Sequence, residues 1–110
     1  MEKVFSQRGG ARIGLFNATW PFARFTIDSN KIELKVLSKK YLFPRNEIAG
    51  LRKYEGIISL GLLIEHQKNE YPHHIVFWTF NFENLKKSTE ILGYRVGDPK
   101  RTDAWWRGGP

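Results

Sequence analysis

Short segments that alternate apolar and polar residues dominate the first half of this chain. The clearest covers residues 31–36, where Ile, Leu and Val at the even positions alternate with Lys, Glu and Lys at the odd ones. Successive side chains of a β-strand point to opposite faces, so this pattern is typical of a strand with one buried and one wet face. The segment therefore predicts a half-buried strand.

Turn residues divide the rest of the chain into further short strands. Residues 28–30 (Asp-Ser-Asn) supply the polar turn of a hairpin. Pro21 cannot donate to a central ladder, so residues 17–21 are expected to form a loop or a sheet corner. Residues 48–54 fit either a strand or a helical turn, and Gly50 favours the strand. The predicted strands cover residues 12–16, 22–27, 31–36, 40–43, 48–54, 62–66 and 74–79.

One helix is expected over residues 81–93. Asn81 is a good N-cap and Gly93 stands at the C′ position. Phe82, Leu85 and Leu92 form a narrow apolar stripe, which we expect to cover the outer side of the apolar strand at residues 74–79. Tyr94 and Val96 are expected to pack on the last turn.

A chain of 110 residues fits one domain. We expect an N-terminal arm over residues 1–10, a barrel with its helix over 11–96, and a C-terminal arm over 97–110. The order of about seven strands and then a helix has no βαβ alternation, which excludes a Rossmann or P-loop fold. The predicted core comprises Ile13, Leu15, Phe25, Ile27, Ile32, Leu34, Leu62, Ile64, Ile75, Phe77, Leu85 and Leu92.

Composition narrows the function classes. The absence of cysteine removes disulfides, thiolate metal sites and thiol nucleophiles. The first ten residues lack the apolar core of a signal peptide, and no apolar run approaches the length of a membrane-spanning helix, so a cytoplasmic location is expected. A net charge of +7 either serves solubility or attracts an anionic partner.

Three segments carry a family resemblance: residues 18–25 (ATWPFARF), 61–66 (GLLIEH) and 71–78 (YPHHIVFW). With the strand order, they resemble the pleckstrin-homology-like (PH-like) superfold, and more narrowly a set of small bacterial PH-like proteins. The resemblance implies a seven-stranded antiparallel barrel plugged at one end by a C-terminal helix. PH-like domains bind phosphoinositides, peptides or proteins, or oligomerise.

The lipid site of phosphoinositide-binding PH domains is not carried over onto this sequence. That site uses a basic cluster around the first loop, whereas residues 17–21 contain no Lys or Arg and only Arg12 and Arg24 flank them. Phosphoinositide binding is therefore not expected.

Catalytic and metal-binding patterns are weak. His73 and His74 are adjacent on a strand and so point to opposite faces, and no three-ligand set with His66 converges. The carboxylate pairs Glu65–Glu70 and Asp28–Glu33 have no spacing that forces them into one cleft, and no Gly-x-Ser-x-Gly elbow is present. We predict no catalytic, cofactor or metal site.

The sequence therefore predicts a non-catalytic binding or scaffolding module that contacts a protein partner or a second copy of itself. The alternative is nucleic-acid binding through basic and aromatic surface residues, and a small enzyme is the third hypothesis. Two adjacent tryptophans near the C-terminus require burial on the barrel, on another subunit or on a membrane surface. The candidate partner-binding residues are Trp20, Arg24, Trp105, Trp106 and Arg107.

Overall fold

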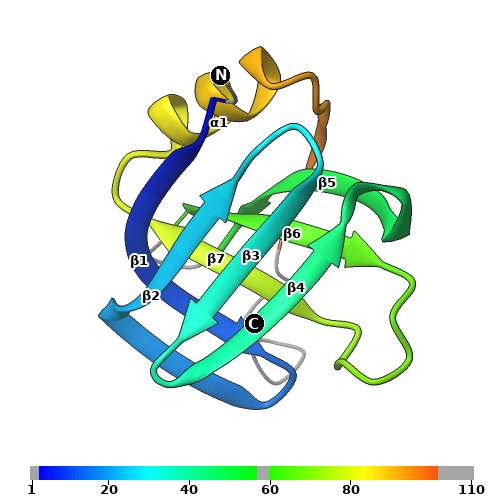
Figure 1. Ribbon diagram of the computed structural model, residues 1–110. Helices are drawn as coiled ribbons and strands as arrows, with labels where there is room; N and C mark the ends of the chain where they lie inside the picture. The colour runs from blue at the N-terminus through cyan, green and yellow to red at the C-terminus, as the bar shows by residue number, and fades with distance from the viewer. Residues whose placement is uncertain (1–2, 57–59, 102–110) are drawn as a thin grey trace.

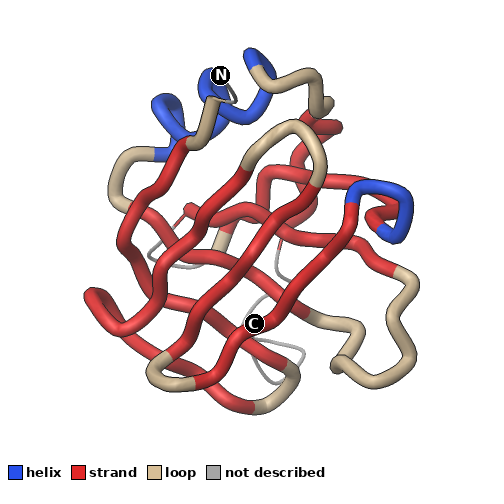
Figure 2. Tube along the Cα trace, in the orientation of Figure 1, coloured by secondary structure: helices blue, strands red, loops and turns tan. Residues whose placement is uncertain are grey.

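The protein is mainly β, with one strongly curled sheet and a C-terminal helix (Figures 1 and 2). The computed structural model describes residues 3–56 and 60–101. The elements are β1 (Phe5–Ile13), β2 (Phe16–Ile27), β3 (Lys31–Val36), β4 (Lys39–Pro44), the 3₁₀ turn η1 (Arg45–Glu47), β5 (Ile48–Glu55), β6 (Leu60–His66), β7 (Ile75–Thr79), α1 (Phe82–Ile91) and β8 (Val96–Arg101).

The sheet curls because β1 pairs with strands from both halves of the chain. The strand order is β4-β3-β2-β1-β7-β6-β5-β8, so β1 lies between β2 and β7. All pairings are antiparallel except that of β8, which runs parallel to β5. The sheet is thus a half-barrel of eight strands, and α1 lies at one end of it in Figure 1. The sequence predicted about seven strands, and the additional strand in the structure is β8.

A large bulge in β2 interrupts its pairing with β1 and bends the two strands. Gly9 pairs with Ala23 and Ala11 with Ala18, so residues 19–22 of β2 stand opposite Gly10 alone. A Cβ on Gly10 would lie 2.6 Å from the Ala18 carbonyl oxygen, so glycine permits this close approach. Of the two expectations for residues 17–21, the loop is wrong, because these residues belong to β2, and the sheet corner corresponds to the bulge within that strand.

The predicted core is confirmed except at two positions. Leu15 is 94% exposed, because β1 ends at Ile13 and Leu15 lies in the turn that follows Gly14. Leu92 is only partly buried, although it packs against the core. The other predicted core residues are all buried in one cluster: Ile13, Phe25, Ile27, Ile32, Leu34, Leu62, Ile64, Ile75, Phe77 and Leu85.

Helix α1 begins and ends as expected. The Asn81 side chain accepts the Asn84 N–H (3.2 Å), and Gly93 adopts a left-handed conformation (φ +92°) beyond the last turn. Its buried side chains Phe82 and Leu85 join the main core. No helix in the described part of the chain is long and apolar enough to cross a membrane.

The helix does not cover the outer face of β7, contrary to expectation. Val76 and Trp78 on that face instead form a second cluster with Tyr54 of β5 and Leu63 of β6. The Tyr54 ring meets the Trp78 ring edge-on, with centroids 5.7 Å apart. The apolar side chains on this face of β7 therefore pack with side chains of β5 and β6.

Both predicted arms contain strand. Residues 5–10 form the first part of β1, because Phe5, Gln7 and Gly9 alternate toward the interior. Residues 97–101 belong to β8, where Gly97 pairs with Arg52. The strand that sequence favoured over residues 48–54 is confirmed as β5.

Candidate binding surface

Four cations at directly opposed positions form a continuous row across the outer face of β1–β4. Arg8 of β1 is directly opposite Arg24 of β2, Arg24 is opposite Lys35 of β3, and Lys35 is opposite Lys40 of β4. The alternation of each strand turns these side chains outward, and all four are exposed. We call Arg8, Arg24, Lys35 and Lys40 the cationic row.

In the part of the chain that the structure describes, the cationic row has no acidic partner. Within residues 3–56 and 60–101, none of its four side chains forms an ion pair, and Arg24 Nη1 donates only to Ser6 Oγ (3.3 Å). Glu33, in the neighbouring row, also lies outside the ion pairs of this part of the chain. Like charges at directly opposed positions of a sheet destabilise it. The cationic row therefore destabilises the fold, and its presence calls for an explanation other than stability.

Exposed aromatic side chains lie at the end of the row nearest the bulge. The Trp20 and Phe80 rings contact each other with centroids 6.2 Å apart, and Phe80 is 85% exposed. Phe22 precedes Arg24 by two residues, so it shares the outer face of β2, and it is half exposed. We call Trp20, Phe22 and Phe80 the aromatic border.

Phe80 is held beside β1 by polar contacts of its neighbours. Gln7 of β1 accepts a hydrogen bond from the Thr79 hydroxyl and donates to the Asn81 carbonyl oxygen (3.3 Å). Phe80, which stands between Thr79 and Asn81, is therefore fixed next to the β1 end of the cationic row.

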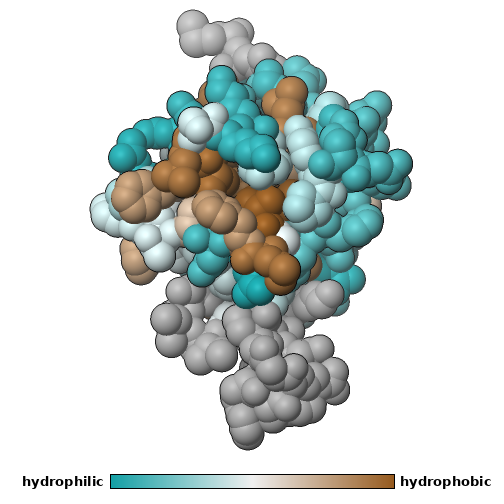
Figure 3. Space-filling model, turned by 90° about the horizontal axis from the view of Figure 1, so that it is seen from below, coloured by the Kyte–Doolittle hydropathy of each residue, from teal (hydrophilic) through white to brown (hydrophobic). Residues whose placement is uncertain are grey.

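The end of the barrel opposite α1 carries an apolar patch. Figure 3 views this end and shows hydrophobic residues gathered in its middle and toward the left, with hydrophilic residues on the right. The β1–β2 and β3–β4 turns lie there and carry the exposed Leu15, Phe16 and Leu37. The Leu37 N–H donates to the Phe22 carbonyl oxygen (2.9 Å), so this apolar patch adjoins the aromatic border.

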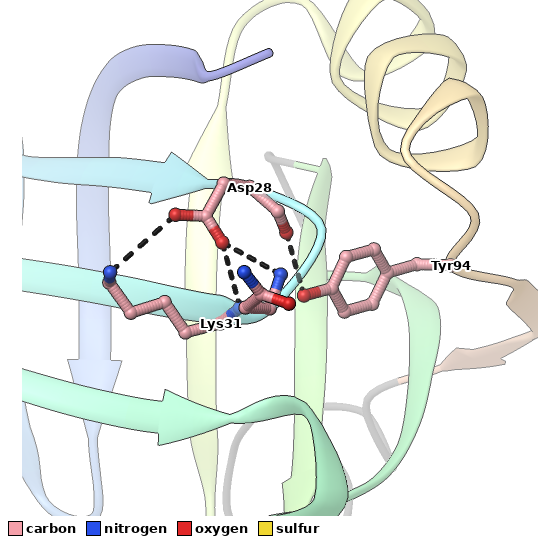
Figure 4. A network of polar contacts seen from close by, with 4 residues as sticks. Asp28, Lys31 and Tyr94 are labelled. Carbon is pink, nitrogen blue, oxygen red and sulfur yellow. Dashed lines mark hydrogen bonds and ion pairs between the residues drawn. The ribbon is translucent and has the colours of Figure 1, made fainter. Parts of the chain in front are cut away.

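A polar network at the other end of β2 and β3 fixes the helix (Figure 4). The Tyr94 hydroxyl donates to the Asp28 carbonyl oxygen (2.8 Å), and burial raises the pKa of Tyr94. Backbone N–H groups of Asn30 (2.7 Å) and Lys31 (3.0 Å) donate to the Asp28 carboxylate, and with the Lys31 ammonium they lower its pKa despite partial burial. This arrangement is an Asx turn, and it is structural.

Arg45 completes the attachment of α1. Its guanidinium donates to the Ser29 (2.9 Å) and Gly93 carbonyl oxygens and lies 4.3 Å from the centre of the Tyr94 ring. A cation at a helix C-terminus also interacts favourably with the helix dipole. Arg45 thus joins the β2–β3 turn to the end of the helix.

His66 and His73 form hydrogen bonds and ring contacts that hold the loop between β6 and β7. His66 is buried, its Nδ1 accepts the Lys68 N–H (3.1 Å) and its Nε2 donates to the Pro72 carbonyl oxygen (2.7 Å). His73 stacks on the His66 ring with centroids 6.2 Å apart. In the described residues, no group of three His, Asp or Glu side chains is placed to hold a metal ion.

The carboxylates weighed for catalysis point to separate partners. Glu65 pairs with Arg52 (3.4 Å), whereas Glu70 pairs with Lys68 (3.8 Å). Lys68 also contacts Glu47 (3.3 Å), and this contact raises the pKa of Lys68. A hollow on the outer side of α1 is lined by Glu83, Asn84, Lys86, Lys87 and Glu90, all from the helix itself. These carboxylates contact different cations and do not converge on one point.

The structure places two of the five predicted partner-binding residues in the candidate surface. Arg24 stands inside the cationic row and Trp20 in the aromatic border. Trp105, Trp106 and Arg107 lie outside the described residues. Sequence reasoning missed Arg8, Lys40 and Phe80, because their relation to Arg24 depends on the pairing of separate strands. It also missed Phe22, which lies two residues before Arg24 in β2. The outward position of Lys35 was predicted, but its alignment with the other cations was not.

Comparison with known proteins adds no identification. The chain matches no protein-family model, and no curated protein matches it significantly.

Proposed function

We propose that this chain is a non-catalytic binding module with a PH-like barrel, and that the outer face of β1–β4 is its binding surface. Support for the PH-like reading comes from β1–β7, whose pairings are all antiparallel, followed by a helix packed on one end of the core. The proposal does not depend on phosphoinositide recognition, for which the β1–β2 turn region lacks the basic cluster.

The cationic row is the observation that carries the proposal. Like charges at opposite positions of a sheet destabilise the fold, and an acidic residue at position 35 would remove this repulsion. An anionic partner that lies along the row explains why all four positions are cationic. The partner is then an acidic protein surface or a nucleic acid.

The two edges of the sheet are poor sites for self-association. Edge strand β4 carries Lys39, Lys40 and Pro44, and its Leu42 N–H donates to the Tyr71 hydroxyl (3.1 Å). Edge strand β8 contains Pro99. Lysine and proline on edge strands hinder strand addition. Two copies that met through their outer faces would bring two cationic rows together, so we expect a partner different from the chain itself.

Heparin affinity chromatography tests the proposal with a generic polyanion. The double variant Arg24→Gln/Lys35→Gln removes two charges from the cationic row. The control Lys86→Gln/Lys87→Gln removes two charges from α1, so both variants carry the same net charge. We expect the row variant to elute at a clearly lower salt concentration than the control, because a linear polyanion follows aligned cations.

Equal elution of the two variants would show that only net charge matters, and it would refute the outer face as the binding surface. Circular dichroism melts of both variants check that each is folded.

A further inference from the structure

We infer that the outer face of β1–β4 binds single-stranded nucleic acid, with backbone phosphates along the cationic row and bases stacked on the aromatic border. The inference rests on the proposed function, whose binding surface it uses, and it names the partner.

The spacing of the row fits a linear polyanion. Neighbouring strands lie about 4.8 Å apart, so four cations on four adjacent strands span roughly 14 Å between Cα atoms. A single small anion can contact one or two of these side chains, so the remaining cations would still repel each other. A chain of phosphates can neutralise Arg8, Arg24, Lys35 and Lys40 together, and counterion release favours this contact.

The aromatic border distinguishes nucleic acid from an acidic protein. Trp20, Phe22 and Phe80 are each half or more exposed, and they stand beside the β1 and β2 members of the row. Bases stack on aromatic faces of this kind, and any base offers a suitable face. Carboxylates alone would leave these rings unused.

A single strand fits better than a duplex. The outer face of β1–β4 is built from the sheet itself, and α1 lies at the end of the barrel (Figure 1). A duplex keeps its base faces stacked inside, whereas unpaired bases are free to leave the stack and contact side chains on a sheet. The aromatic border can serve only bases that are unpaired.

Fluorescence anisotropy with a labelled oligo-dT of about 12 nucleotides tests the inference, because this length is within the range that small sheet-based binders occupy. The proteins are the full chain, Arg24→Gln/Lys35→Gln, Phe80→Ala and the control Lys86→Gln/Lys87→Gln. At about 50 mM salt, we expect the row variant to bind about tenfold or more weakly and to show a shallower salt dependence.

Phe80→Ala separates stacking from charge. We expect it to weaken binding about fivefold or more with an unchanged salt dependence, because it removes a base-stacking surface and no charge. Phe80 is 85% exposed, so the variant is expected to fold normally. The helix control is expected to bind like the unmodified chain.

Three results would overturn the inference: no binding of oligo-dT, equal losses in the row variant and the helix control, or no effect of Phe80→Ala. Vesicles of anionic phospholipid that bind more tightly than oligo-dT would also overturn it, in favour of a membrane surface. If heparin retention still depends on the cationic row in any of these cases, the binding surface stands and only the nucleic-acid assignment fails.

Discussion

Leu85 has no exposed surface and carries the attachment of α1 to the core. Replacing a fully buried leucine by alanine removes its transfer free energy and leaves a cavity, so Leu85→Ala is expected to lower the free energy of unfolding by about 2–5 kcal/mol. Urea denaturation measures this change. On the same helix, Ile91 is largely exposed, and Ile91→Ala is expected to change stability by less than about 0.5 kcal/mol. If Leu85→Ala lowers the free energy of unfolding as little as Ile91→Ala does, the helix is peripheral to the core.

Asp28 gives the fold a defined acid sensitivity. Hydrogen bonds from Asn30 and Lys31 hold the pKa of Asp28 below its usual value of 3.8, so the unfolded chain binds a proton more readily than the folded one. The resulting stabilisation is present above pH 3.8 and is lost as pH falls through the lower folded pKa. We expect the unmodified chain to lose stability below about pH 4 more steeply than Asp28→Asn, whose amide oxygen still accepts both N–H groups.

Urea denaturation at a series of pH values from about 6 to 2 tests this expectation. Other carboxylates contribute equally to both proteins, so the difference between the two curves isolates Asp28. Curves that stay parallel in acid would contradict the prediction.

Among the elements, the β1–β2 bend depends on the absence of a side chain at Gly10. A Cβ there would meet the carbonyl oxygen of Ala18 at 2.6 Å and the backbone of residues 19 and 20 at 3.2 Å, so the bulge would have to move. Overpacking of this kind costs about 1–3 kcal/mol, and Gly10→Ala is expected to lower the denaturation midpoint accordingly. Trp20 and Phe22 of the aromatic border lie in the bulged segment of β2, so the variant should also reduce oligo-dT binding.

Gly97→Ala in β8 is the matched control for the bend. The nearest atom to a Cβ at Gly97 is 3.5 Å away, which is an ordinary contact. We expect little change in stability, and a loss as large as that of Gly10→Ala would mean that any glycine substitution in a strand, rather than the bulge, explains the effect.

Local patterns were sufficient to predict the strands with strong alternation, and insufficient where pairing partners decide. The hairpin of β2 and β3 followed from the turn at residues 28–30, and α1 from Asn81 and Gly93. Residues 1–10 were predicted to form an arm, yet residues 5–9 pair with β2 as the first part of β1. Residues 97–110 were predicted to form an arm, and parallel pairing with β5 instead makes residues 97–101 part of β8.

The candidate surface was predictable only in part for the same reason. Sequence alternation places Lys35 on the wet face of its strand, but it does not say which residue of the next strand stands opposite. The row of Arg8, Arg24, Lys35 and Lys40 exists only once three registers are set. Phe80 follows the end of β7, so its position beside Trp20 depends on the β1–β7 pairing.

For the whole molecule, the distribution of charge predicts a variant that is more stable than the natural chain. Lys35→Glu replaces a cation opposed by Arg24 and Lys40 with an anion that can pair with both. Favourable opposed pairs contribute roughly 0.2–1 kcal/mol each, so for the two pairs we expect a gain of up to about 2 kcal/mol in the free energy of unfolding at low salt. The gain should shrink as salt screens the charges.

Lys87→Glu is the control, since it makes the same change in net charge but stands on α1 with Glu83 and Glu90 one turn away on either side. We expect no gain there. An unchanged or lower stability of Lys35→Glu would show that the cationic row is not strained. A more stable variant that no longer binds heparin would show a direct conflict between folding and binding at this face.

The position of β1 between β2 and β7 also governs how the molecule forms during translation. Residues 10–13 find their second neighbour only when residues 75–78 have left the ribosome, so for most of synthesis β1 is a bare edge. Pairings this distant along the chain slow folding, and unpaired edges invite association between nascent chains. Ribosome stalling or truncation before β7 is complete would therefore yield aggregates, and overproduction at reduced temperature or with chaperones should raise the yield of folded protein.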